Sequence, residues 1–186
     1  PAPLPGEPED ARGMAYWFPP LAPTPLSGPT ERRDAAVELL KAGGQPAKTH
    51  DDVAAVSGFP TAMLMPLLLS LEAGEWKFSE LAGPYHGPRA LEGLREAFKI
   101  VSTHRNQPVP FWLRFVNMAS LKSLLWLAPK FVPLPLETYL AFHFTKVGEQ
   151  TRLFIDTYIQ LGETHGLPTR ALKALRRPTM EAAAAA

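Results

Sequence analysis

The stretch DDVAAVSGFPTAMLMPLLLSL, residues 51–71, decides the fold. Its 19 residues from 53 to 71 carry no charge, which brings it near the lower length limit of a membrane span. Pro60 and Pro66 should interrupt or kink it, and its flanks are acidic, whereas a membrane span usually has Lys or Arg flanks. A helix that is apolar on every side is also what the centre of a helical domain requires. We therefore predict a buried core helix rather than a membrane helix.

The composition indicates a folded domain without a large excess of positive or negative charge. The chain has 186 residues, 46% of them apolar, with 19 Lys and Arg against 18 Asp and Glu. Such a balance argues against general disorder and against a dedicated nucleic-acid-binding protein, which shows a concentrated basic face. The absence of cysteine excludes disulfides, cysteine-ligated zinc and a thiol nucleophile within this chain. It fits a cytoplasmic protein, which is the location we expect.

The distribution of prolines divides the chain into three parts. Residues 1–30 contain nine prolines, a density that excludes helix and central strand. The aromatic run at residues 14–18 (MAYWF) is either an edge strand or a linker that docks on the core. We expect a helical domain over residues 31–177, and a low-complexity tail, ending in five alanines, over residues 178–186.

Apolar periodicity and helix-ending residues predict a mainly all-α fold, a helical bundle preceded by a short extended or β segment. Thr30 is a candidate N-cap for the first helix, and Asp51 or Asp52 for the second. QPAKTHDD, residues 45–52, is predicted to be extended or a loop. The sequence predicts helices over residues 31–42, 53–71, 89–104, 111–127, 136–163 and 168–177, and a short helical turn within 75–81.

Most familiar catalytic signatures are missing from the sequence. It contains no GxGxxG, no HExxH and no GxSxG, and no histidines at metal-ligand spacing. Lys146, Glu149 and Arg152 lie on neighbouring turns of a predicted helix, where a solvated ladder of ion pairs is the simplest interpretation. No catalytic site follows from these patterns alone.

Aromatic residues are abundant between residues 111 and 144, where they alternate with Arg114, Lys122 and Lys130. This pattern is compatible with a membrane-surface segment, a dimer interface, a lid over an apolar pocket, or plain core. We favour core or an interface over a membrane surface.

The order of these segments resembles the ketopantoate reductase family. MAYWFPPLAPTPLSG, an amphipathic helix, QPAKTHDDVAA and an apolar helix with an internal proline follow one another as they do in that family. Residues 24–28 (TPLSG) resemble its "TxLG"-like turn, and residues 143–175 resemble its last long helix, its "GxPTP"-like turn and its closing helix. The resemblance covers residues 14–175, and the order and spacing carry it more than any single motif.

The resemblance implies the helical C-terminal domain of a ketopantoate reductase or 6-phosphogluconate dehydrogenase-like protein. Such a protein reduces a 2-oxo acid with NADP(H), and a Rossmann domain binds the cofactor. The Rossmann fingerprint would lie before residue 1, and residues 1–30 would be a remnant of the nucleotide-binding domain, so we expect this chain alone to be inactive. The resemblance further implies a homodimer and a small 2-oxo acid, or a related small molecule, as the ligand.

The resemblance also locates the family's active-site residues in the apolar stretch. The catalytic Lys position falls at Ser57 or Gly58, and the two Asn positions fall near Thr61 or Ala62 and at Met65. None of these side chains can replace an ammonium group as a proton donor. Catalysis is therefore expected to be divergent or lost. The substrate-binding candidates are Thr61, Thr145, Lys146, Glu149 and Gln150.

Two readings of function follow. The first is a substrate-binding and dimerisation domain of a ketopantoate reductase-like, NAD(P)-dependent oxidoreductase acting on a 2-oxo acid. The second is a non-catalytic helical interaction module, or a membrane-surface binder, that retains this fold. A nucleotide-binding domain upstream in the same gene would favour the first reading.

Overall fold

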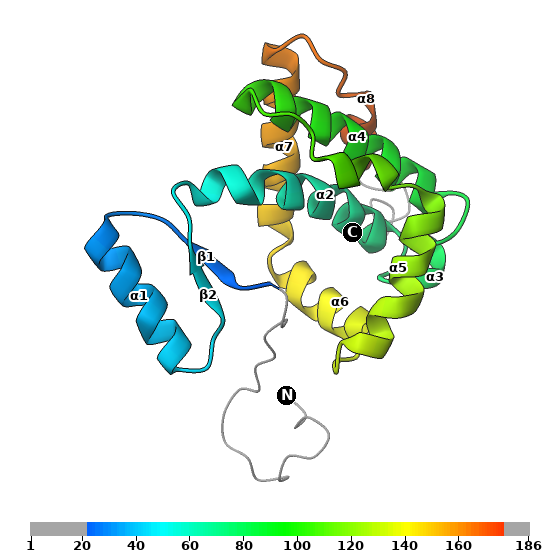
Figure 1. Cartoon of the computed structure of the whole chain (residues 1–186). Helices are drawn as coiled ribbons and strands as arrows, with labels where there is room; N and C mark the ends of the chain where they lie inside the picture. The colour runs from blue at the N-terminus through cyan, green and yellow to red at the C-terminus, as the bar shows by residue number, and fades with distance from the viewer. Residues whose placement is uncertain (1–21, 177–186) are drawn as a thin grey trace. The chain divides into compact units, whose positions relative to one another are not determined.

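The computed structural model describes residues 22–176. This part of the chain is mainly helical, with eight α-helices, one 3-10 helix and two short strands, which confirms the expected all-α class. The chain divides into two compact units, Pro1–Ser57 and Gly58–Ala186. The helical region expected over 31–177 is thus shared between them (Figure 1). The expected strand or linker at 14–18 and the tail at 178–186 lie outside the described residues.

The described part of the first unit is a small β-α-β element. Strand β1 Thr24–Leu26 and strand β2 Ala47–Thr49 pair in parallel, with Thr24 opposite Ala47. Helix α1 Thr30–Ala42 connects them and buries Val37. Parallel strands require such a crossover connection. The extended segment predicted around residues 45–52 is therefore confirmed as β2.

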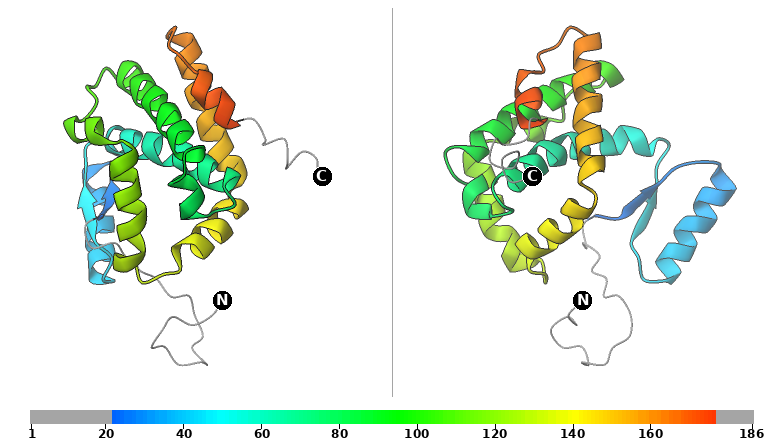
Figure 2. Two further views of the ribbon diagram at one scale, coloured as in Figure 1. Left: turned by 90° about the vertical axis from the view of Figure 1, so that its right-hand side faces the viewer. Right: turned by 180° about the vertical axis from the view of Figure 1, so that it is seen from behind.

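The second unit contains the remaining helices, and α2 begins in the last residues of the first unit. Helices α4, α7 and α8 pack together, and Ile100, Ile155 and Leu172, one from each helix, have no exposed surface. Figure 2 shows α8 (red) beside both α4 (green) and α7 (orange). The elements are α2 Val53–Ala73, α3 Phe78–Leu81, α4 His86–Arg105, the 3-10 helix η1 Phe111–Phe115, α5 Met118–Phe131, α6 Leu136–Lys146, α7 Gly148–Thr164 and α8 Arg170–Arg176.

Helix α2 is the apolar stretch that decides the fold. It is long and apolar enough to cross a membrane by length and composition. Its residues from Phe59 onward nevertheless supply much of the core of the second unit, including Leu68, which is 2% exposed. The prediction of a core helix is confirmed for this part of α2. The helix runs without a break through both prolines, and buried Pro66 lies against Gly93 of α4, whose missing side chain makes room for Leu175.

The residues at helix starts only partly match the expected caps. Asp52 caps α2, because its Oδ1 accepts a hydrogen bond from the Ala54 N–H at 2.8 Å. Thr30 is the first residue of α1 rather than its cap, and Pro29 stands at the capping position. The last helix begins at Arg170 and not at Pro168.

A carboxylate from another helix caps α8. Both oxygens of Glu96, on α4, accept hydrogen bonds from the first free N–H groups of α8, those of Ala171 at 3.1 Å and Leu172 at 3.0 Å. These N–H groups have no partner within their own helix. Glu96 therefore fixes the closing helix on α4, in addition to the buried Leu172.

Two predicted long helices are each divided. The expected helix over 136–163 ends at Lys146 and restarts at Gly148, because Val147 leaves helical geometry (φ −110°, ψ 22°) in front of a glycine of low helix propensity. The expected helix over 111–127 is a 3-10 turn followed by α5. Asn117 starts α5 through a capping box with Ser120, with its side chain accepting from the Ser120 N–H at 3.1 Å.

Candidate functional site

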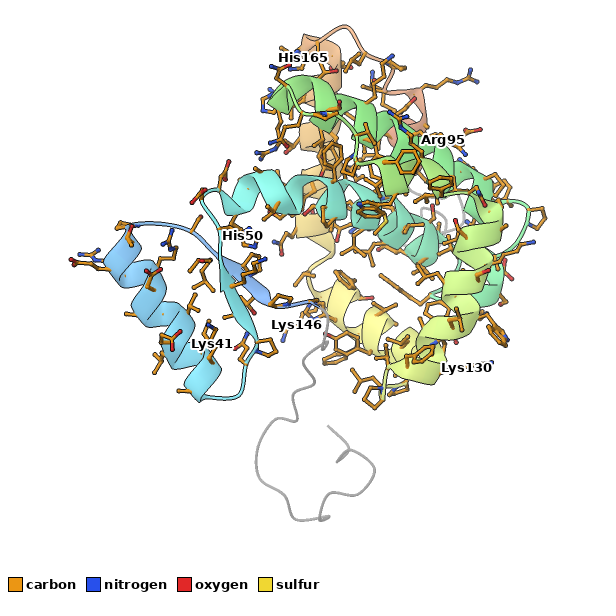
Figure 3. The ribbon with its side chains drawn as sticks, in the orientation of Figure 1. Lys41, His50, Arg95, Lys130, Lys146 and His165 are labelled. Atoms are coloured by element: carbon orange, nitrogen blue, oxygen red, sulfur yellow. The ribbon has the colours of Figure 1, made fainter. Side chains whose placement is uncertain are left out.

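The structure places the substrate-binding candidates on three helices. Thr61 is half-buried on α2, Thr145 and Lys146 are exposed at the end of α6, and Glu149 and Gln150 are exposed in the first turn of α7. Figure 3 labels Lys146 at the end of α6. The break between α6 and α7 means that the predicted single-helix ladder does not form.

The ion pairs of this region use other residues. Arg152 bonds to Glu72 of α2, with Nη2 2.8 Å from Oε1, and its contact with Glu149 is looser at 3.9 Å. No hydrogen bond or ion pair within residues 22–176 joins Thr61 to Thr145, Lys146, Glu149 or Gln150. The five candidates therefore do not form one connected polar site in this structure.

Ser57 and Gly58, where the resemblance predicts a Lys, have different roles. The Ser57 hydroxyl donates to the Val53 carbonyl at 2.6 Å, so its hydrogen-bonding capacity serves its own helix. Gly58 instead faces α4. A β-carbon at Gly58 would lie 3.2 Å from Nε of Arg105 and 3.4 Å from Cγ1 of Val101. The space beside Gly58 is thus occupied by a cationic side chain from another helix.

Arg105 is the last residue of α4. Asn106 ends the helix in the left-handed conformation, with φ 50° and ψ 42°, so Arg105 lies at the negative end of the helix dipole. Its side chain is half-buried. No carboxylate of residues 22–176 lies within ion-pair distance of it. A half-buried guanidinium without an internal counter-ion is suited to binding an anion.

Tyr158 of α7 is the third member of this group. It is 7% exposed, and burial raises the pKa of its hydroxyl to about 12, although the positive charge of Arg105 acts in the opposite direction. We call Gly58 of α2, Arg105 of α4 beside it, and Tyr158 of α7, whose hydroxyl is affected by the charge of Arg105, the Arg105 site.

The chemistry open to the Arg105 site is binding rather than proton transfer. A guanidinium stays protonated in proteins and binds carboxylates through two parallel N–H donors. Tyr158, with its pKa near 12, also keeps its proton at neutral pH. Neither group can release a proton as readily as a general acid tuned to neutral pH. The arrangement can hold a small carboxylate, and it lacks a general acid tuned to neutral pH.

A pair of histidines lies next to this site in sequence. The Nδ1 of His104 is 3.4 Å from the Nε2 of His165, and both rings are exposed (Figure 3 labels His165). Within the described residues no group of three or more His, Cys, Asp or Glu side chains is arranged to hold a metal ion. The pair is best described as a contact that joins the end of α4 to the end of α7.

Sequence reasoning missed Arg105 and Tyr158 as site residues. One signal was present, because a glycine inside a helix costs about 1 kcal/mol relative to alanine and often marks a close approach of another group. Gly58 marks such an approach here. Which side chain fills the space could not be read from spacing, because Arg105 comes from a segment 47 residues further on.

Tyr158 should make the free energy of unfolding depend on pH at alkaline pH, and phenylalanine at this position would remove that dependence. Between about pH 10 and 12 an unfolded tyrosine has lost its proton and the buried one has kept it, so the unfolded state binds fewer protons and stability falls as pH rises. Two pKa units correspond to about 2–3 kcal/mol over this window. Urea unfolding of the natural chain and of Tyr158→Phe, repeated at several alkaline pH values, measures this loss of stability. Equal pH dependence in the two proteins would contradict the buried environment of Tyr158.

Comparison of the chain with protein-family models, with curated proteins and with solved structures finds no match.

Proposed function

We propose that this chain is the substrate-binding and dimerisation domain of a ketopantoate reductase-like, NAD(P)-dependent oxidoreductase, and that it binds a small 2-oxo acid with divergent or lost catalysis. The observation that carries the proposal is the position of Arg105. Its guanidinium lies beside Gly58, one of the two positions where the resemblance expects the catalytic Lys. A positive charge is therefore present at that place, but it is supplied by α4 instead of α2.

The order of the elements supports the same proposal. A parallel β-α-β element precedes a helical unit, and the sequence resemblance expects a late piece of a nucleotide-binding domain to be followed by a helical domain in this order. Parallel strands joined by a helix are the building unit of such nucleotide-binding domains.

The described residues do not fit NADP(H), which the resemblance implies. A dinucleotide site needs a glycine-rich turn between a strand and a helix, whose N–H groups hold the pyrophosphate. Here the turn from β1 to α1 is Ser27-Gly28-Pro29, which has one glycine and a proline without an N–H. We therefore assign no cofactor-binding role to residues 22–57.

Dimerisation in this proposal rests on exposed apolar residues of α6 and α7. Phe142 is 75% exposed and Leu153 is 65% exposed, and α6 buries none of its residues. Isolated exposed apolar residues are ordinary on a protein surface. Helix α6 packs on its own unit through the half-buried Leu140 and Phe144, and a second copy of the chain would cover its exposed side chains.

Arg105 should dominate the affinity for a 2-oxo acid. Replacing it with alanine removes charge-assisted hydrogen bonds, each of which contributes about 1.5–3 kcal/mol, so we expect affinity to fall roughly 10- to 100-fold. Calorimetric titration of the chain with ketopantoate measures the change. Arg95→Ala is the matched control, because Arg95 is an exposed arginine of the same helix (Figure 3) and should leave the affinity unchanged.

The second candidate function, a non-catalytic interaction module, is favoured by a specific observation. Tyr158 has a pKa near 12, far from neutral pH, and Ser57 is bonded within its own helix. Absence of any ketopantoate binding by the natural chain would support this module and exclude the substrate-binding role. Binding that is equal in Arg105→Ala and the natural chain would exclude the Arg105 site.

A further inference from the structure

The η1 and α5 segments expose an unusual number of large apolar side chains. Plain core was one expectation for this region, and it is wrong for most of these side chains. In η1 and α5 only Leu113 and Leu121 are buried. Phe131 is 75% exposed and Trp126 is 65% exposed. We call the exposed set the aromatic face; it comprises Phe111, Trp112, Phe115, Leu124, Trp126, Leu127 and Phe131.

The side chains of the aromatic face are ordered along the helix. Leu124, Leu127 and Phe131 follow at intervals of three and four residues, so they form one stripe along α5. Trp126 shares a second stripe with Lys122 and Lys130. At the start of the segment the Phe111 and Phe115 rings meet edge to face, with centroids 5.1 Å apart. Figure 1 shows α5 leading from α4 toward α6 within the second unit. The exposed apolar surface is thus continuous in sequence over about 20 residues.

The charge of this segment is entirely positive. Arg114, Lys122 and Lys130 lie within it, and the sequence contains no Asp or Glu between Glu96 and Glu137. Two of these cations lie over aromatic rings. Lys130 Nζ lies 3.1 Å from the centre of the Trp126 ring, and the Arg114 guanidinium lies 5.9 Å from the centre of the Phe111 ring. Figure 3 labels Lys130 on α5.

We propose that the aromatic face binds the surface of a membrane containing anionic phospholipids. Tryptophan and phenylalanine beside Lys and Arg are the residues with which proteins enter the boundary between headgroups and acyl chains. The apolar side chains would enter this boundary while Arg114, Lys122 and Lys130 pair with the lipid phosphates. Because these side chains protrude, they can enter a fluid phase that needs no matching pocket.

Charge complementarity favours this occupant over a second copy of the chain. A two-fold interface through the aromatic face would bring the same surface of each copy together. Three cations would then meet three cations, with no carboxylate in the same segment to neutralise them. An anionic lipid surface complements both the charge and the apolar side chains. The dimer considered above would use α6 and α7 and is separate from this face.

The test is co-sedimentation of the 186-residue chain with vesicles of phosphatidylcholine and with vesicles that also contain phosphatidylserine. We expect binding to the second kind. Replacing Arg114, Lys122 and Lys130 with glutamine should lower the partition coefficient roughly 100-fold, at about a fivefold loss per cation. Trp126→Ser with Phe131→Ser should also release the chain. A control that removes as many charges elsewhere, Arg95→Gln with Lys99→Gln and Lys173→Gln, should bind like the natural chain.

Two further measurements distinguish a loss of membrane binding from unfolding and from self-association. Circular dichroism of each variant confirms that it is folded, which we expect because the altered side chains are exposed. Analytical ultracentrifugation without lipid reports self-association. Absence of sedimentation with either vesicle would overturn the proposal, and so would equal binding to both vesicle types. Self-association that the aromatic-face variants abolish, without vesicle binding, would assign the face to a second copy instead.

Discussion

Replacing Gly87 with alanine is expected to lower the free energy of unfolding by about 2–3 kcal/mol, in the range of overpacked interiors. Gly87 is buried at the start of α4, and a β-carbon there would lie 2.5 Å from the Leu81 carbonyl oxygen. It would also lie 2.6 Å from Cε of Met118, a flexible side chain that can move. The carbonyl belongs to the backbone, so α3 and α4 must separate to relieve the contact.

Gly58→Ala is the matched control for Gly87→Ala. It is also a glycine in a helix, but its nearest neighbour is the side chain of Arg105, which can shift. Alanine has the higher helix propensity, so this variant should be as stable as the natural chain or more stable by up to about 1 kcal/mol. Thermal and urea unfolding, followed by circular dichroism, measure the stability of both variants. Equal stability of the two variants would contradict the close packing of α3 against α4.

Replacing Glu96 with alanine is expected to cost about 2–4 kcal/mol and to release α8 from α4. The substitution leaves the N–H groups of Ala171 and Leu172 without their carboxylate acceptor. Hydrogen bonds to a charged group contribute about 1.5–3 kcal/mol, and partly buried donors left unpaired cost about as much. Glu96→Gln, which keeps an acceptor oxygen but loses the charge, should fall between alanine and the natural chain.

The effect of Glu96 is separable from a general loss of charge on α4. Glu92 is exposed on the same helix, and Glu92→Ala should change the free energy of unfolding by less than about 0.5 kcal/mol. Hydrogen exchange of the α8 amides, measured on both variants, locates the change. If the α8 amides exchange equally slowly in Glu96→Ala and Glu92→Ala, then Glu96 does not hold the helix.

The parts of the fold that follow from local chemistry were predictable. The apolar stretch at residues 51–71 indicated the core helix, and Asp52 caps it as one of two expected residues. The amphipathic pattern predicted α4 to within a few residues of His86–Arg105. Apolar periodicity fixes which face of such a helix is buried, and capping residues fix where it starts.

The breaks inside two long helical patterns were not predicted. The apolar pattern continues across Val147 and across Asn117, so periodicity alone joins what the structure separates. The capping box of Asn117 and Ser120 was a readable signal, because an Asn followed three residues later by a hydroxyl side chain can start a helix. At Val147 the only signal was the following glycine. Local propensity was too weak there to outweigh the periodic pattern.

The side chain beside Gly58 could not be predicted from the sequence. The resemblance pointed to Ser57 and Gly58 as the position of a Lys of α2, and the structure has the Arg105 side chain of α4 beside Gly58. Contacts between helices that are far apart in sequence depend on tertiary packing, which spacing does not reveal. Exposure of the aromatic face depends on the same packing.

The central claim is that Arg105 supplies the positive charge that a Lys at Gly58 would otherwise provide. The most direct test is calorimetric titration of ketopantoate into the natural chain, Arg105→Ala, and the double variant Gly58→Lys with Arg105→Ala. The alanine variant vacates the space beside Gly58, and the lysine of the double variant can then extend an ammonium group into it. We predict that the natural chain binds, that Arg105→Ala loses most of the affinity, and that the double variant recovers part of it. Unchanged affinity in Arg105→Ala, or no binding by the natural chain, would contradict the claim.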